Sequence, residues 1–261
     1  MSEFKSKVVV ITGGSRGIGR GIAEVFAREG AQTVIASTSE RNLATAADAI
    51  EKSGALKPLT AALDLRKLAD CETLHALVTE KLGRCDVLIN NAGATKAGNF
   101  LELTDETWFD GFMLKFFGCV RLSRLFWPML TEAQGCVVNI GGGAARTPSS
   151  DFLIGGSCNS AMANFTKGLS RLGMKDGVNV NIIHPGLTAT DRVQDLFAQR
   201  ASAAGKTIGE ISAAAVARDG IKRMAEPADI AELTLFLCSE KGRHIQGAAI
   251  PVDGGSTPGY Y

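Results

Sequence analysis

Tyrosine is almost missing from this sequence: the chain holds two, Tyr260 and Tyr261, and both stand at its C-terminal end. A tyrosine phenol is therefore excluded from every internal position. An excess of either charge is missing as well, since 28 basic and 27 acidic residues leave a net charge of +1. This balance, with 45% hydrophobic residues, argues against a disordered chain and against a nucleic-acid-binding surface. We expect a small-molecule ligand.

Paired cysteines and long apolar runs are also missing. The six cysteines are scattered, without a CxxC pair and without metal-type spacing to any of the three histidines, which predicts free thiols and no metal site. No stretch approaches the ~20 apolar residues that span a bilayer. The first residues run directly into an apolar strand. We expect a cytoplasmic protein that binds neither metal nor membrane.

Apolar runs of strand length alternate with amphipathic stretches along the chain. Buried strands of a parallel sheet have short, continuous hydrophobic runs. Six such runs occur, at 8–11, 33–36, 58–63, 86–89, 137–140 and 178–183. Apolar residues recur at helical spacing between them. We predict one domain over 1–261 with a doubly wound α/β fold, in which helices cover both faces of a mainly parallel sheet.

The segment 188–217 differs from the rest of the chain. It is rich in Ala, Gln, Ser and Gly, lacks a strong hydrophobic period, and precedes a helix that we expect to begin near Pro227. We interpret it as a mobile lid over a ligand cleft.

A glycine-rich loop, TGGSRGIG at 12–19, directly follows the first predicted strand and opens a helix. Glycines allow the backbone to approach a pyrophosphate, and a helix N-terminus offers free N–H groups to its charge. An ordinary tight turn is the alternative, but the position between strand and helix favours phosphate binding. The candidate contacts are Gly13, Ser15, Arg16, Gly17, Ile18 and Gly19.

Four further motifs follow in order along the chain. They are Asp64-Leu65, Asn90-Asn91-Ala92-Gly93, Pro185-Gly186 with Thr188, and Val252-Asp253-Gly254-Gly255. Together with the glycine loop they make the chain resemble the short-chain dehydrogenase/reductase family, from about residue 7 to 255. The resemblance implies a Rossmann fold, an oxidoreductase activity with a nicotinamide dinucleotide, and a homotetramer or homodimer.

The resemblance also implies further cofactor contacts. Asp64 and Leu65 would bracket the adenine, and Asn91, Ala92 and Gly93 would line the cleft. The nicotinamide carboxamide would meet Pro185, Gly186 and Thr188.

The end of the second strand decides the choice of cofactor. A carboxylate there accepts hydrogen bonds from a free ribose 2′-OH and repels a 2′-phosphate, but this chain has Ser37, Thr38 and Ser39. Arg16 and Arg41 would add positive charge for a 2′-phosphate. We favour NADP(H). NAD(H) stays open if both arginines are ordinary solvated cations.

The resemblance fails at the residues that carry the family's chemistry. Such enzymes use a tyrosine as general acid/base, a lysine one helical turn later, an upstream serine and a helix asparagine. In this sequence the matching positions hold Gly155, Asn159, Gly142 and Lys115. Glycine has no proton to give, so the usual general acid, worth ~10²–10⁴-fold in rate, is absent.

Several residues are candidates for the missing acid. Our hypothesis is that Lys115 replaces the relay, with burial lowering its pKa; the alternative is a lysine that points outward or holds ribose hydroxyls. Tyr260 or Tyr261 of a neighbouring subunit is a second candidate. A desolvated Asp151 is a third. Cys158 and His184 fit structural roles better than a nucleophile–base pair.

Two classes of function follow. The first is an NADP(H)-dependent oxidoreductase with a non-standard active site. The second is a catalytically inactive NADP(H)-binding sensor or scaffold. Glycines at 141–143 and 155–156 would widen the site for a larger substrate or an additional ligand.

Overall fold

The computed structural model describes residues 2–258, so Tyr260 and Tyr261 lie outside the described part of the chain. Within it, seven strands form one sheet in the order β3-β2-β1-β4-β5-β6-β7, and every neighbouring pair is parallel. The strands are β1 Val8–Thr12, β2 Gln32–Ser37, β3 Leu59–Ala62, β4 Val87–Asn90, β5 Cys136–Ile140, β6 Asn179–Pro185 and β7 Ala249–Val252. The predicted doubly wound α/β fold is confirmed.

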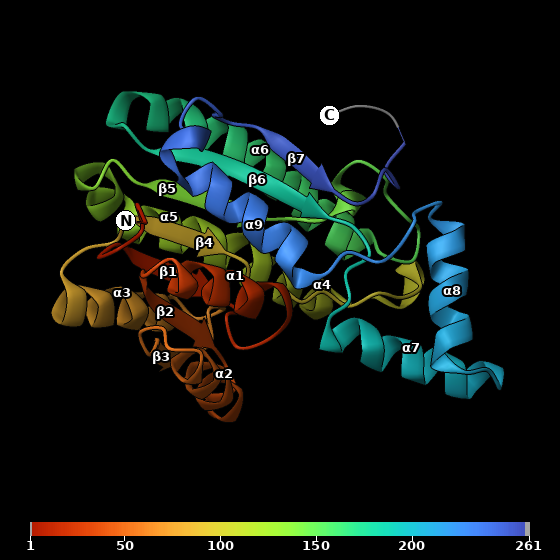
Figure 1. Cartoon of the computed structure of the whole chain (residues 1–261). Coiled ribbons are helices and arrows are strands. Elements are labelled where there is room, and N and C mark those ends of the chain that lie inside the picture. The colour runs from red at the N-terminus through yellow and green to blue at the C-terminus, as the bar shows by residue number, and fades with distance from the viewer. Residues whose placement is uncertain (1, 259–261) are drawn as a thin grey trace.

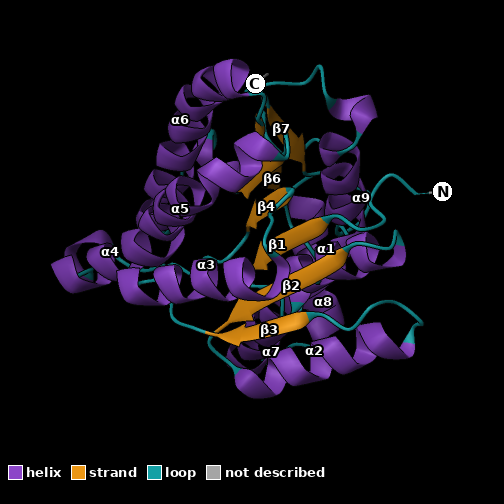
Figure 2. Cartoon of the chain, turned by 90° about the vertical axis from the view of Figure 1, so that its left-hand side faces the viewer, coloured by secondary structure: helices purple, strands orange, loops and turns teal. Residues whose placement is uncertain are grey.

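Helices cover both faces of the sheet (Figure 2). Side chains of α1, α2 and α9 form one buried core with the strands, and those of α3 and α5 form a second core on the opposite face. The α-helices are α1 Gly17–Arg28, α2 Glu40–Lys52, α3 Leu68–Leu82, α4 Asp105–Phe112, α5 Gly118–Glu132, α6 Leu153–Asp176, α7 Asp191–Ala204, α8 Ile208–Arg218 and α9 Pro227–Cys238. Pro227 is the first residue of α9, as predicted.

A π-helical turn, η2 Met113–Phe117, joins α4 to α5. Thr104 caps α4 by accepting a hydrogen bond from the Thr107 amide. Wide turns of this kind are rare and occur often at functional sites, because one extra residue turns a side chain out of the helical register. Here that turn carries Lys115.

The segment 188–217 forms most of α7 and α8, which project beyond the carboxyl ends of the strands (Figure 1). Both helices have an N-terminal cap, from Thr190 and from a capping box of Thr207 with Glu210. The sequence interpretation did not identify these helices, since their exposed faces give little hydrophobic period. The mobility of this segment stays a prediction. No helix within residues 2–258 combines the length and apolarity needed to cross a membrane.

Candidate active site

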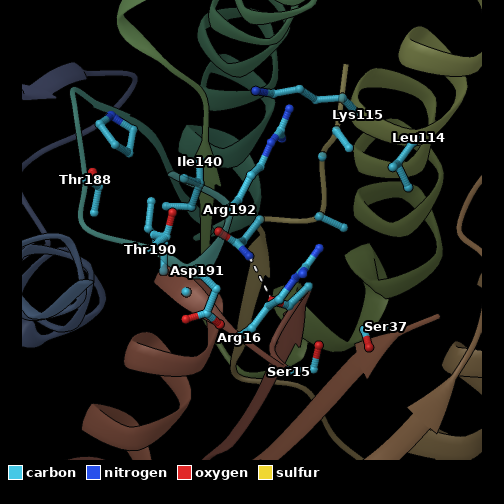
Figure 3. Close-up of a pocket in the computed structure, with 18 of the residues that line it drawn as sticks. Ser15, Arg16, Ser37, Leu114, Lys115, Ile140, Thr188, Thr190, Asp191 and Arg192 are labelled. Atoms are coloured by element: carbon cyan, nitrogen blue, oxygen red, sulfur yellow. Dashed lines mark hydrogen bonds between the residues drawn. The ribbon is translucent and has the colours of Figure 1, made fainter. Parts of the chain in front are cut away.

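A cleft of about 770 Å³ follows the carboxyl ends of the strands (Figure 3). Fourteen of the sixteen residues predicted to contact a cofactor line it: Gly13, Ser15, Arg16, Gly17, Ile18, Ser37, Thr38, Leu65, Asn91, Ala92, Gly93, Pro185, Gly186 and Thr188. The two others, Gly19 and Asp64, do not line it. Residues from five separate segments of the sequence are therefore brought together at one edge of the sheet.

The glycine loop is shaped for close approach to a ligand. Gly13 and Gly17 have φ values of +66° and +54°, a region that favours glycine. Arg16 is the N-cap residue of α1 and makes no side-chain capping bond, and the first helical residues, Gly17 and Ile18, line the cleft. A Cβ at Gly19 would overlap the Gly13 carbonyl, so the packing around position 19 requires a glycine there. The loop thus has the geometry of a phosphate site.

Asn91 and Thr12 connect the loop after β4 to the end of β1. The Asn91 amide nitrogen donates to the Thr12 carbonyl at 2.9 Å, and the Thr12 hydroxyl accepts from the backbone of Asn91 and Ala92, both at 2.9 Å. These bonds fix the floor of the cleft. Asn91 therefore positions the backbone there and also lines the cleft.

The end of β2 carries no carboxylate. Ser37, Thr38 and Ser39 line this end of the cleft together with Asn42, which the sequence analysis did not single out. The Ser39 hydroxyl accepts from the Asn42 amide and so caps α2. Arg16 lines the same end, whereas Arg41 is exposed outside the cleft.

The carboxylate of Asp64 is held by Arg66. Its carboxylate accepts from the side chain and backbone of Arg66, at 2.9 and 3.1 Å, and these hydrogen bonds lower the pKa of Asp64. Arg66 also pairs with Asp110 of α4. The adenine contact of Asp64 stays a prediction, while its neighbour Leu65 does line the cleft.

Lys115 enters the cleft from the π-helical turn. Its Nζ donates to the Gly141 carbonyl at 3.3 Å, and the side chain is half-buried. Burial, with a smaller effect from Arg192, lowers the pKa of Lys115 to about 8. An ammonium with that pKa is mostly protonated at neutral pH and can release its proton far more readily than an exposed lysine.

Asn159 lies beside the same segment. It is 2% exposed, its Oδ1 atom has no hydrogen-bond partner among the described residues, and its Nδ2 lies 2.8 Å from where a Cβ on Gly142 would stand. A serine at 142 would press against the Asn159 amide. The glycine therefore gives room to the buried Asn159 side chain.

Gly155 lies in the first turn of α6. A Cβ built there would overlap the ring of Phe152, which occupies the space where any side chain at 155 would begin. Phe152 was not predicted from the sequence.

Asp151, Cys158 and His184 have little support as the acid, while the candidates Tyr260 and Tyr261 lie outside the described residues. The Ser149 hydroxyl bonds Asp151 and lowers the pKa of that exposed carboxyl, which keeps it ionised. Burial raises the pKa of Cys158 to about 11 and lowers the pKa of His184 to about 4. His184 Nδ1 accepts from the Gly142 amide at 3.1 Å. A protonated thiol and a neutral, buried imidazole fit structural roles.

The sheet order, the glycine loop and the cleft at the strand ends define a dinucleotide-binding α/β protein. A family model described as short chain dehydrogenase matches residues 7–201. This chain therefore belongs to the short chain dehydrogenase family.

Several similar proteins are named as dehydrogenases or reductases. Meso-2,3-butanediol dehydrogenase of Serratia marcescens is 31% identical over 98% of this chain and 96% of the relative. The 3-oxoacyl-(acyl-carrier-protein) reductase FabG of Vibrio cholerae is 28% identical, over 97% and 98%. L-Sorbose reductase from Gluconobacter frateurii, solved with NADPH and L-sorbose, superposes with a TM-score of 0.95 at 31% identity over 99% of both chains.

Proposed function

We propose that this protein is an NADP(H)-dependent oxidoreductase in which Lys115 supplies the proton that a tyrosine supplies elsewhere in the family. The observation that carries the proposal is the half-buried Lys115 ammonium inside the cofactor cleft, with its pKa lowered to about 8.

The cleft suits NADP(H). The glycine loop and the uncapped N-terminus of α1 offer N–H groups to a pyrophosphate. Ser37, Thr38 and Arg16 offer donors and positive charge to a 2′-phosphate where an acid would repel it. The similar L-sorbose reductase was solved with NADPH, which supports the same choice here.

Lys115 would complete a carbonyl reduction. When bound, the reduced cofactor would supply a hydride to the carbonyl carbon, so that negative charge would develop on the carbonyl oxygen. The Lys115 ammonium stabilises that charge and then transfers a proton to the oxygen, becoming a neutral amine. Because Lys115 lines the cleft and is not fully buried, the cleft is the route by which solvent would return the proton.

Asn159 does not line the cleft and its Oδ1 atom is buried, so we give it no role in proton transfer. Gly142 and Gly155 contribute no hydroxyl, so Lys115 acts without the two neutral donors that the family provides. We expect turnover to be slower than with a complete relay.

A second function is favoured by Gly155 and Phe152. The ring of Phe152 fills the space where a side chain at 155 would begin, which suits a protein that binds NADP(H) without reducing a substrate. Such a protein would sense the cofactor or serve as a scaffold.

Two measurements separate these functions. The first is calorimetric titration with NADPH, NADH and the oxidised forms. The second is an assay of a panel of ketones and alcohols in which the reduced nicotinamide is monitored. We expect NADPH to bind more tightly than NADH, and at least one substrate to turn over. Lys115→Met should preserve NADPH binding and reduce turnover by ~10²–10⁴-fold. Lys96→Met, at an exposed lysine outside the cleft lining, is the control.

The alternatives give different results. Tight NADPH binding with no turnover across the panel would favour the sensor. Full turnover by Lys115→Met would remove Lys115 from the relay.

A further inference from the structure

Arg192 is an unassigned cation at the same end of the cleft as Lys115. It is the second residue of α7 and lines the cleft. In Figure 3 its guanidinium points toward Lys115, while Asp191 points away from Lys115, toward the glycine-loop end. The two cations thus approach each other from opposite walls.

Both cations donate hydrogen bonds to backbone carbonyls. Lys115 bonds the Gly141 carbonyl, and Arg192 bonds the Thr95 carbonyl at 3.3 Å. Among the described residues, no carboxylate forms an ion pair with either side chain. Arg192 contributes to the lowered pKa of Lys115, which means that the two positive charges repel each other. Two adjacent, unpaired cations favour an anion between or beside them.

The phosphates of the cofactor are expected elsewhere. The glycine loop and Arg16 lie at the opposite end of the cleft from Lys115 (Figure 3). The N-terminus of α7 approaches this loop through Thr190, whose Cγ2 lies 3.2 Å from where a Cβ on Gly17 would stand. Arg192 instead extends past this contact to the carbonyl of Thr95. Its guanidinium is therefore placed for the substrate.

We propose that Arg192 binds a carboxylate of the substrate, so that this protein acts on short oxo acids. The inference rests on the proposed function for the reaction, but it concerns binding alone. A guanidinium fixed by the Thr95 carbonyl can present its remaining N–H groups to both oxygens of a carboxylate. The carbonyl of such a substrate would lie beside Lys115, while its acid group remains on Arg192.

Binding without turnover tests this inference. The protein saturated with NADP⁺ is titrated calorimetrically with pyruvate, acetoacetate and levulinate, and with the methyl ester of each. Each ester keeps the carbonyl and removes the negative charge. We expect at least one acid to bind at least about tenfold more tightly than its ester, as charge-assisted hydrogen bonds predict.

Variants of α7 assign the effect to one residue. Arg192→Gln should remove the preference for the acid and leave NADP⁺ affinity within about twofold, whereas Arg192→Lys should keep part of the preference. Arg200→Gln, at an exposed arginine of the same helix outside the cleft lining, should behave like the unmodified protein.

Three results would overturn the inference. Equal affinity for acids and esters is one, and the absence of saturable binding by every acid is another. The third is an Arg192→Gln variant that weakens NADP⁺ as strongly as it weakens the acid, since Arg192 would then serve the cofactor. Acid binding with no redox turnover would instead contradict the proposed function and leave the anion site standing.

Discussion

Replacing Gly155 by alanine tests the contact between α6 and Phe152. A Cβ at 155 would overlap the Phe152 ring, whereas a Cβ at Gly168, in the same helix, meets no atom within 4 Å. Alanine favours a helix over glycine by about 0.8–1 kcal/mol in the interior, and by less in the first turn. Gly168→Ala should therefore raise the free energy of unfolding by about 0.5–1 kcal/mol.

Gly155→Ala should have the opposite sign. The Phe152 ring must leave its position, at about 0.5–1.5 kcal/mol for a distorted rotamer or about 1–2 kcal/mol for exposing the half-buried ring. We expect the free energy of unfolding to change by between about zero and −2 kcal/mol. A tyrosine introduced at 155 meets the same obstacle, so this change alone should not create the family's usual acid.

Urea denaturation of a double-mutant cycle isolates the effect. Gly155→Ala is compared in the unmodified protein and in a Phe152→Ala background, so that helix propensity at 155 cancels. We expect a coupling free energy of about 1–3 kcal/mol, because the ring that obstructs the methyl group is gone in the second pair. A coupling near zero, or a Gly155→Ala variant as stabilised as Gly168→Ala, would refute the reasoning.

Three further predictions concern protons and cofactor choice. Carbonyl reduction should slow as pH rises through about 8, because the pKa of Lys115 is about 8 and its acid form is then lost; a rate unchanged to alkaline pH in stopped-flow assays would contradict this. The lowered pKa of His184, about 4 against an ordinary 6.5, favours the neutral form in the folded protein. The resulting stability, up to ~3 kcal/mol, is present above about pH 6.5 and lost as pH falls toward 4. In His184→Asn, the free energy of unfolding measured in urea should depend less on pH between about pH 4 and 6.5. An unchanged pH dependence would contradict this prediction. Thr38→Asp should shift the ratio of NADPH to NADH affinity toward NADH by about tenfold or more, while the exposed Thr45→Asp should not.

The sequence predicted the sheet because its strands are short apolar runs buried on both faces. β1, for example, is buried at every position. β7 was not identified as a strand, since it contains Pro251 and its residues remain partly or fully exposed at the sheet edge. The glycine loop was predictable for a different reason: its φ values and close contacts admit few other residues.

The substrate end of the cleft was less predictable. Lys115 was found only because the resemblance marked its position, and the π-helical turn that directs it has no signature in the sequence. Phe152 and Arg192 were missed. Their roles depend on contacts with Gly155 and with the Thr95 carbonyl, which only the folded chain brings together.

The π-helical turn between α4 and α5 makes this site sensitive to the length of the chain as well as to its side chains. Such a turn accommodates one residue more than a regular helix, and each residue rotates a helix by about 100°. Deleting Met113, Phe116 or Phe117, none of which lines the cleft, would let α4 and α5 merge into an uninterrupted helix, with Lys115 rotated away from Gly141 while every side chain that lines the cleft is retained. A one-codon deletion here could therefore abolish chemistry without unfolding the protein, a route to divergence that comparing residue identities alone would overlook.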